Sequence, residues 1–433
     1  MKWPRKKGPV AELEKVCSER EREREVLYPR CAGLDVHEKT VVACVRIQQG
    51  QSVEQEVRTF ETTTSALLDL SAWLSEKGCT LAAMEATGVY WKPVWHILAD
   101  GEFELLLANA AHVKNAPGRK TDVNDATWLS ELAAHGLIRG SFVPDRPTQE
   151  LRSLLRTRKQ LVRERSSHIL RLQKTLEDGN IKIDSVISDI LGVSGRAMIE
   201  AIIAGQTDPT VLAGLANRRI RATREELREA LRGRLTRHHR FLLELHLEQI
   251  DALDRAIARI DEGVKSDFDS FRDATEIVKT IPGFDDLSAQ SVLSEIGVDM
   301  SRYPSDNHLV SWACMCPRND ESAGKRRSTR MRKGSRWLKA TLFSCAWAAA
   351  RTKGCYFHAL FHRIKARRGA KKAIGAVATS LLRTIYHMLK DGTLYQDLGA
   401  DYFDKRHKTA STRRLVQRLQ NLGFAVQLTP VPA

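Results

Sequence analysis

The chain has 433 residues, with 69 lysines and arginines against 53 aspartates and glutamates, and its formal net charge is +16. This length predicts two to four domains, and the 42% of hydrophobic residues can give each one a core. No apolar run reaches the roughly 18 residues that span a bilayer, and none follows the basic first residues, so we expect neither a membrane protein nor a secretory signal. The eight cysteines form no CxxC pair, which indicates reduced thiols in a cytosolic protein, without disulfides or a zinc site.

The charge is distributed unevenly along the chain. Residues 1–30 carry 9 basic and 6 acidic side chains (+3), and residues 31–145 carry 9 and 15 (−6). Residues 146–321 carry 27 and 28 (−1), whereas residues 322–433 carry 24 and 4 (+20). The last quarter therefore predicts a polyanionic partner. A basic surface kept only for solubility is the alternative, but mixed charge serves solubility equally well.

A charged helix and a mixed α/β domain are expected first. Residues 1–30 form a charged segment with a helix over residues 9–27. From Cys31, β-branched runs on each side of His37 predict a β-hairpin. The elements expected next are a strand at Val53–Thr59, a helix at Thr62–Gly78, a strand at Cys79–Glu85, a helix at Val89–Gly101, a strand at Glu104–Asn109 and a helix at Asp122–His135. This order predicts an α/β domain over residues 31–147.

The remaining chain is helical by pattern. Residues 148–275 include the stretch Arg218–Val264, whose apolar spacing predicts a long amphipathic helix or an antiparallel coiled coil. An ordinary bundle helix fits this stretch equally well, whereas a coiled coil would make it a dimerisation or spacer element. We expect a mainly helical domain over residues 276–400 and a basic tail over residues 401–433. Basic loops would separate the helices expected at Trp337–Thr352, Ala370–Leu389 and Thr412–Leu422.

A Pro-Gly turn joins two expected helices in VKTIPGFDDLSAQSVLSEIG, residues 278–297. The segment is similar to a helix-hairpin-helix motif, in which the backbone N–H groups of the turn approach a nucleic-acid phosphate. Pro282 and Gly283 would permit that approach. The same pattern also serves a plain pair of packed helices.

Four carboxylates occupy positions in the α/β domain that suit a metal site. Asp35 lies in the first strand, Glu85 ends an apolar strand, and Asp122 and Asp125 share one face at the start of a helix. Open α/β sheets bind ligands at the carboxyl ends of their strands. Clustered carboxylates favour Mg²⁺ or Mn²⁺, and two such ions about 4 Å apart would stabilise both the attacking and the leaving oxygen of a phosphodiester exchange.

Each acid also has an ordinary structural explanation. Asp122 could cap a helix, and Asp125 could be a favourable acid in its first turn. Glu85 could pair with an arginine, and Asp35 could cap the hairpin. Two of the acids nevertheless lie in strands that are otherwise apolar, where an unpaired charge is costly, and this favours the metal site.

The motifs GLDVHEKT, MEATGVYW and KTDVNDA, in this order and spacing, resemble the signature of the DEDD insertion-sequence transposases, a family of RNA-guided (bridge-RNA) recombinases. The resemblance continues through IPGF, SWACMCPRNDESAGKRRSTRMRKGSRWLKATL and YQDLGADYFD, and so covers nearly the whole chain from about residue 31. It implies an RNase H-like (RuvC-like) first domain in which Asp35, Glu85, Asp122 and Asp125 bind the metal.

A serine at the entrance of a basic loop is the candidate nucleophile. A serine hydroxyl needs a base, a metal or a positive field for activation, and without these Ser322 would only cap a turn. The resemblance implies that Ser322 attacks the DNA phosphate and forms a covalent phosphoserine link; Ser328 is the rival. The chain has Ser328-Thr329 and Gly334-Ser335 where the family commonly has Ser-Gly and Gly-Asn. The residues expected to hold the phosphate backbone are Lys325, Arg326, Arg327, Arg330, Arg332, Lys333 and Arg336.

These features predict a DNA recombinase of an insertion sequence, located in the cytoplasm with the nucleoid. The resemblance implies donor and target DNA, a structured non-coding guide RNA and a homo-oligomer, from dimer to tetramer, as partners. Two other functions stay open. A metal-dependent nuclease of the Holliday-junction-resolvase type would need the four acids but no serine step. A non-catalytic nucleic-acid-binding protein would need neither.

Overall fold

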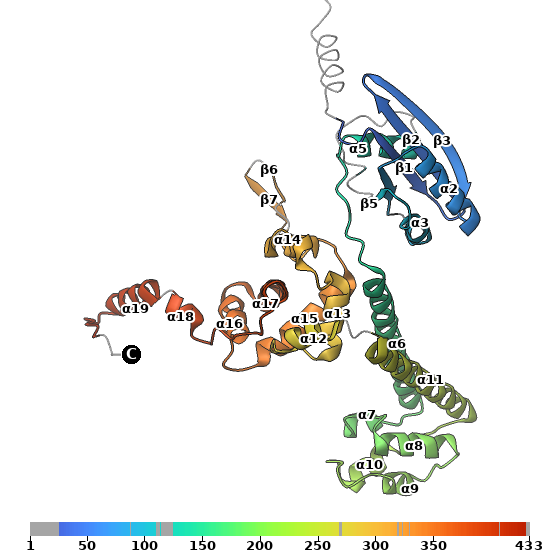
Figure 1. Cartoon of the computed structure of the whole chain (residues 1–433). Coiled ribbons are helices and arrows are strands. Elements are labelled where there is room, and N and C mark those ends of the chain that lie inside the picture. Colours follow the sequence, from blue (N-terminus) through green and yellow to red (C-terminus); the bar gives the residue numbers. More distant parts are fainter. Residues whose placement is uncertain are drawn as a thin grey trace, which may run out of the picture. The chain divides into compact units, whose positions relative to one another are not determined.

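In a computed structural model, the described residues are 26–86, 88–109, 113, 124–267, 271–317, 320–322, 324–328, 330–406 and 408–429 (Figure 1). The helix expected over residues 9–27 lies almost entirely outside this part of the chain. The chain divides into two compact units, Met1–Val143 and Pro144–Ala433. Among the described helices, none is long and apolar enough to span a membrane.

The first unit is built on a five-stranded mixed sheet. Its strands are β1 (Arg30–Val36), β2 (Thr40–Gln49), β3 (Ser52–Glu61), β4 (Leu81–Glu85) and β5 (Glu104–Ala108). Their order is β3-β2-β1-β4-β5, and the β1–β2 and β2–β3 pairs are antiparallel, whereas β1–β4 and β4–β5 are parallel. The expected hairpin and strands are therefore confirmed, and the mixed α/β character of this unit with them.

Helices cover both faces of this sheet. On one face, Ala32, Leu34 and Val36 pack with helices α2 (Thr64–Glu76) and α3 (Trp91–Leu98). On the other face, Cys31 packs with α5 (Asp125–Ala134), because successive side chains of a strand point to opposite faces. Burial raises the pKa of the Cys31 thiol to about 12, so this cysteine is a core residue. The seven described cysteines are all free.

The second unit begins with two long helices that pair antiparallel. Helix α6 (Arg146–Asp178) lies against α11 (Arg237–Asp267). The ion pairs Arg158–Asp261 and Arg165–Asp254, with Nε–Oδ1 distances of 2.5 Å, run in opposite directions along the two helices, and His239 contacts Asp178 near the far end. The long amphipathic helix expected in this stretch is thus present as α11, and it pairs with α6 of the same chain.

The long helix expected over Arg218–Val264 begins only at Arg237. Helix α10 (Arg224–Ala230) ends before α11 begins, and Gly233 lies in the segment between them. A β-carbon at Gly233 would come within 2.3 Å of the Gly179 carbonyl oxygen, so close packing forces the chain to turn here. Between α6 and α11, four short helices surround a core of their own: α7 (Ile183–Val186), α8 (Val193–Ile203), α9 (Pro209–Gly214) and α10.

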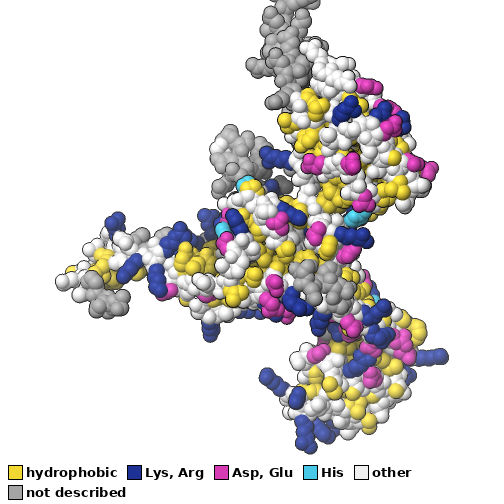
Figure 2. Space-filling view, viewed as in Figure 1, with side chains coloured by type: hydrophobic (Ala, Val, Ile, Leu, Met, Phe, Trp, Pro, Cys, Tyr) yellow, Lys and Arg dark blue, Asp and Glu magenta, His cyan; other side chains and the backbone are white. Residues whose placement is uncertain are grey.

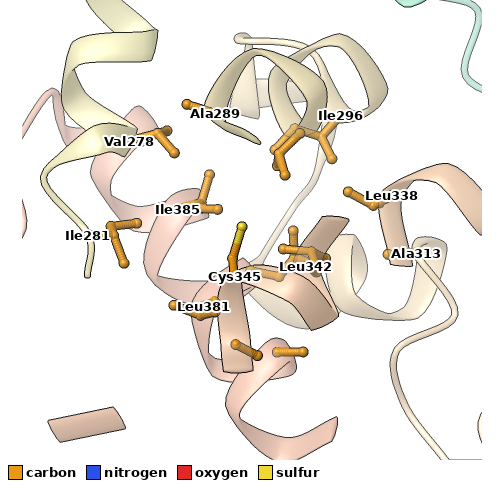
Figure 3. Packing of buried hydrophobic residues seen from close by; sticks show 14 of the residues in the cluster. Val278, Ile281, Ala289, Ile296, Ala313, Leu338, Leu342, Cys345, Leu381 and Ile385 are labelled. Atoms are coloured by element: carbon orange, nitrogen blue, oxygen red, sulfur yellow. The ribbon is translucent and has the colours of Figure 1, made fainter. Parts of the chain in front are cut away.

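The C-terminal helices share one large core, which Figure 3 shows around Cys345, Leu342, Leu381 and Ile385. They are α12 (Arg272–Lys279), α13 (Asp286–Ile296), the short η2 (Met300–Arg302), α14 (Asp306–Trp312), α15 (Arg336–Arg351), α16 (Tyr356–Arg368) and α17 (Ala370–Asp391). Helices α18 (Tyr402–Arg406) and α19 (Lys408–Asn421) follow them in the chain. The three helices expected in this region are confirmed.

One of the expected basic loops is instead helix α16. Phe357 and Phe361, four residues apart, lie on one helix face and are buried in the core, while the basic side chains of this helix include exposed Arg363 and Arg367. The many basic residues hid the amphipathic spacing of the two aromatic ones. The tail over residues 401–433 likewise contains helices α18 and α19.

A buried carboxylate joins α6, α13 and α15. Glu295 is 4% exposed, and its carboxylate accepts bidentate hydrogen bonds of 2.7 and 2.8 Å from the Arg156 guanidinium. Ser335, which caps α15, also donates to it at 3.1 Å. Arg152 donates to the carbonyl oxygens of Ser294 and Glu295 at the end of α13. These bonds satisfy a charge that would otherwise be costly to bury.

We predict that Gly33→Ala destabilises the first unit. An added β-carbon would lie 2.1 Å from the Ala126 carbonyl oxygen and 2.4 Å from the Ser130 nitrogen, so α5 must shift. The expected cost is about 1–3 kcal/mol in the free energy of unfolding, read from urea unfolding and from faster hydrogen exchange in β1. The control is Gly140→Ala, where the nearest atom would be Leu106 Cγ at 3.6 Å. Equal stability of the two variants would contradict the close packing of α5.

Candidate active site

Asp35 and Glu85 lie side by side at the carboxyl ends of two parallel strands. Leu34 pairs with Met84, and Asp35 and Glu85 are the next residues of β1 and β4. Alternation along each strand puts both acids on the face that α5 covers. The Asp35 side chain is 19% exposed, so it lies at the rim of the sheet rather than in its core.

The first turn of α5 brings a third acid to this face. Helix α5 begins at Asp125, and its N-cap is Asn124, whose Oδ1 accepts a hydrogen bond of 3.1 Å from the Ala126 N–H. The same turn packs directly on Gly33, two residues before Asp35. Asp125 therefore belongs to the same face and the same end of the sheet as the two strand acids. Asp122 lies outside the described residues.

A histidine that sequence reasoning did not assign to the site contacts Asp35. His37 Nε2 lies 3.2 Å from Asp35 Oδ2, and the histidine side chain is 58% exposed. The two residues are two positions apart, the spacing that puts side chains of an extended chain on one side. That spacing in Asp-Val-His was the signal that could have identified His37.

The acids fit a divalent metal by their chemistry. Carboxylate oxygens are the ligands that Mg²⁺ and Mn²⁺ prefer, and three of the four expected acids come from one face and one end of the sheet. Among the described residues, no three His, Cys, Asp or Glu side chains lie close enough together to hold an ion.

The candidate serine lies in a short hairpin rather than an open loop. Strands β6 (Asp320–Ser322) and β7 (Lys325–Ser328) pair antiparallel, with Ser322 opposite Lys325 next to the turn. Gly324 in the turn has a φ of +73°, which favours glycine. The side chain of Ser322 is not described. The rival, Ser328, lies at the other end of the hairpin, where its hydroxyl accepts a hydrogen bond of 3.2 Å from the Arg330 N–H.

The basic residues around this hairpin differ in their contacts. Lys325, Arg330 and Lys333 are exposed, whereas Arg332 donates from Nη2 to the carbonyl and hydroxyl oxygens of Ser311, both at 2.9 Å. Arg332 therefore anchors the segment to α14. Arg326 and Arg327 lie in β7, and their side chains are not described. Arg336 opens α15 and lies over the Trp337 ring.

The Pro-Gly turn joins α12 to α13, as expected, but its glycine has a packing role. Gly283 has a φ of +90°, and an added β-carbon would lie 2.6 Å from the Cys345 carbonyl oxygen of α15. The Phe284 N–H donates to the Ile281 carbonyl oxygen at 3.2 Å within the turn. Close packing alone thus explains the glycine, and a phosphate contact by Pro282 and Gly283 stays a prediction.

Comparison with known proteins agrees with this architecture. Residues 32–181 match the DEDD transposases of IS110 elements, and residues 275–362 match the transposase family of IS116, IS110 and IS902 elements. A protein named "Probable family 20 transposase" from Pseudomonas aeruginosa is 25% identical over 323 residues, which cover 73% of this chain and 86% of that protein.

The chain therefore contains two transposase domains. Its acid-bearing sheet lies within the first match, and its serine hairpin lies within the second. More particularly, it carries both domains of an IS110-family insertion-sequence transposase.

We predict that the acids are needed for DNA cutting. Glu85→Gln and Asp125→Asn should each lower the rate of strand cleavage by about 10²-fold or more. A lost carboxylate ligand weakens the binding of the metal ion, and the metal ion would stabilise the negative charge of the transition state. Cleavage of a labelled duplex by the wild type should also stop in EDTA and return with Mg²⁺ or Mn²⁺. The control is Glu102→Gln, an exposed acid of the same unit. Normal cleavage by Glu85→Gln or in EDTA would contradict the metal site.

Proposed function

We propose that this transposase exchanges DNA strands through an acid-and-metal half and a serine half, under the guidance of a structured RNA. The observation that carries the proposal is the placement of Asp35 and Glu85 on adjacent parallel strands, with Asp125 of α5 on the same face. The strand order β3-β2-β1-β4-β5 supports an RNase H-like domain for this half.

The acidic half would bind metal through Asp35, Glu85, Asp122 and Asp125. Two Mg²⁺ or Mn²⁺ ions would supply charge stabilisation for the oxygens of the reacting phosphate. The protein's own contribution is orientation. The sheet ladder holds the backbones of Asp35 and Glu85, and the packing of α5 on Gly33 holds the first turn in which Asp125 lies. Rigid strands and a packed helix position such ligands better than loops do.

The serine half would carry the covalent step. Ser322 Oγ would attack the phosphorus, a phosphoserine bond would form, and the bond from phosphorus to the departing deoxyribose oxygen would break, with the serine proton balancing that oxygen. Ser322 is favoured over Ser328 by its place beside the hairpin turn and by the resemblance to the family's nucleophilic serine. Exposed Lys325, opposite Ser322, supplies a positive field for the phosphate.

The guide RNA and the oligomer are proposed from the basic C-terminal region, the family resemblance and the division into two units. The region from residue 322 carries +20, which suits RNA and DNA backbones alike, and Figure 2 shows many Lys and Arg side chains on the C-terminal helices. The resemblance to the bridge-RNA recombinases adds the guide. Because the two halves belong to separate compact units, a partner copy could complete the site in a dimer or tetramer.

A resolvase-type nuclease is the second candidate function. One observation favours it: the described acids lie within the first unit and need no residue of the second for their placement. In that case water, rather than Ser322, would attack the phosphorus, and the product would be a cut strand with no protein attached.

Ser322→Ala distinguishes the two mechanisms. We expect it to abolish strand exchange and the covalent protein–DNA adduct while leaving DNA binding nearly unchanged, because one neutral hydroxyl adds little to backbone affinity. The measurement is denaturing gel analysis of a labelled DNA substrate, and Ser328→Ala is the matched control. Full strand exchange by Ser322→Ala would support the nuclease instead, and loss of the adduct only in Ser328→Ala would move the nucleophile to that residue.

The guide RNA is tested on the full chain as it is expressed beside its own insertion sequence. Sequencing of the nucleic acid that co-purifies should give one discrete, structured RNA from the flank of the element. Retention should fall steeply with salt, because phosphate contacts release counterions. Fragments spread evenly over the transcriptome would contradict RNA guidance but leave the serine mechanism standing.

A further inference from the structure

Three arginines lie over one tryptophan in the second unit. Arg156 of α6 is 6.0 Å from the centre of the Trp337 ring and is paired with Glu295, and two further arginines lie closer to the ring. The Cζ atom of Arg163, on α6, is 4.9 Å from the centre of the Trp337 ring, and that of Arg336, at the start of α15, is 4.7 Å away. Both guanidinium groups belong to exposed residues, and Trp337 is half-buried between their helices. The ring therefore holds two like charges close together at the surface.

The guanidinium N–H groups of Arg163 and Arg336 are available for hydrogen bonds. Among the described residues, neither side chain makes a hydrogen bond or an ion pair, whereas Arg156, Arg158 and Arg165 of α6 each bind a carboxylate. Stacking on a ring orients a guanidinium but uses none of its five N–H donors. Both groups are thus pre-oriented with their N–H edges available, which is the arrangement that suits bidentate binding of phosphate.

The carboxylate of this region, Glu295, is hydrogen-bonded to neither Arg163 nor Arg336. Lys159, one helical turn before Arg163, donates to the Thr341 hydroxyl at 3.0 Å, and burial together with the Arg163 charge lowers its pKa. Glu295, which lies in the same region, is committed to Arg156 and Ser335. The surface between α6 and α15 is therefore positive, and bringing its arginines together has a cost that a polyanion would offset.

We infer that Arg163 and Arg336, held on Trp337, bind the phosphodiester backbone of a nucleic acid. The inference rests on the proposed function only in its choice of a nucleic acid as the polyanion. It gives α6 a part in binding, in addition to the spacer role that its pairing with α11 indicates. The site adds Arg163 and Trp337, which lie outside the serine hairpin, to Arg336, which the sequence already assigned to phosphate binding.

The test compares two arginines of the same helix in the full chain. Arg163→Gln should weaken binding several-fold and lower the slope of log affinity against log salt by about one, because one phosphate contact is lost. The control is Arg171→Gln, an exposed arginine two turns further along α6, which should change neither. Binding is measured by fluorescence anisotropy between 50 and 200 mM salt, with a duplex DNA and an RNA hairpin as separate probes.

The arms of the experiment separate the possible results. Weaker binding of one probe alone would assign the site to DNA or to RNA, and an equal effect of Arg171→Gln would overturn the site in favour of general charge. An unchanged slope with a lower melting temperature would mean that the stack only joins α6 to α15, and would also overturn it. Trp337→Leu keeps both charges, so weaker binding by this variant supports orientation by the ring.

Failure of this inference is distinguishable from failure of the proposed function. Binding to the Arg163–Arg336 site needs neither Ser322 nor a metal ion. The anisotropy measurements are therefore repeated with Ser322→Ala and in EDTA, where the effect of Arg163→Gln should persist. Persistence together with lost strand exchange would keep the site and leave the mechanism to its own tests.

Discussion

The close approach of helix α5 to strand β1 is the constraint on which the acidic site depends. The helix can come so near only because residue 33 has no side chain, and the approach brings the first turn of α5 to the end of the sheet that carries Asp35 and Glu85. With a wider spacing, Asp125 would leave that edge. The parallel pairing of β1 and β4 places Asp35 beside Glu85, because it aligns the carboxyl ends of two strands that are 50 residues apart in the chain.

The second unit is organised by a buried charge. Glu295 gathers Arg156 and Ser335, and Arg152 covers the end of α13, so that α6, α13 and α15 meet around one polar cluster beside an apolar core. Such a cluster stabilises only the arrangement in which all its bonds form together. The same arrangement carries Arg163 of α6 to Trp337 of α15, and places α15 directly after the segment that Arg332 anchors to α14.

The sequence pattern predicted most helices and strands, and it failed where tertiary packing or a high content of basic residues obscured the pattern. Runs of β-branched residues and short apolar runs identified the strands of the sheet, and helical patterning identified α15, α17 and α19. Helix α16 was missed because its basic residues outnumber Phe357 and Phe361, the two residues that it buries in the core. The break at Gly233 was missed because its cause is a contact with Gly179, far away in the sequence. His37 was missed as a neighbour of Asp35 because it was assigned only to the hairpin.

The sequence by itself determined which residues can do chemistry: acids in apolar strands, a serine among basic residues, and a charge that changes from −6 to +20 along the chain. These are properties of composition and order, so they need no coordinates. Only the tertiary structure decided which of them meet. Strand register joined Asp35 to Glu85, packing on Gly33 added Asp125, and the α6–α15 contact brought two unpaired arginines to one ring. The physical reason is that such contacts join residues far apart in the chain, and packing in three dimensions, rather than periodicity, selects them.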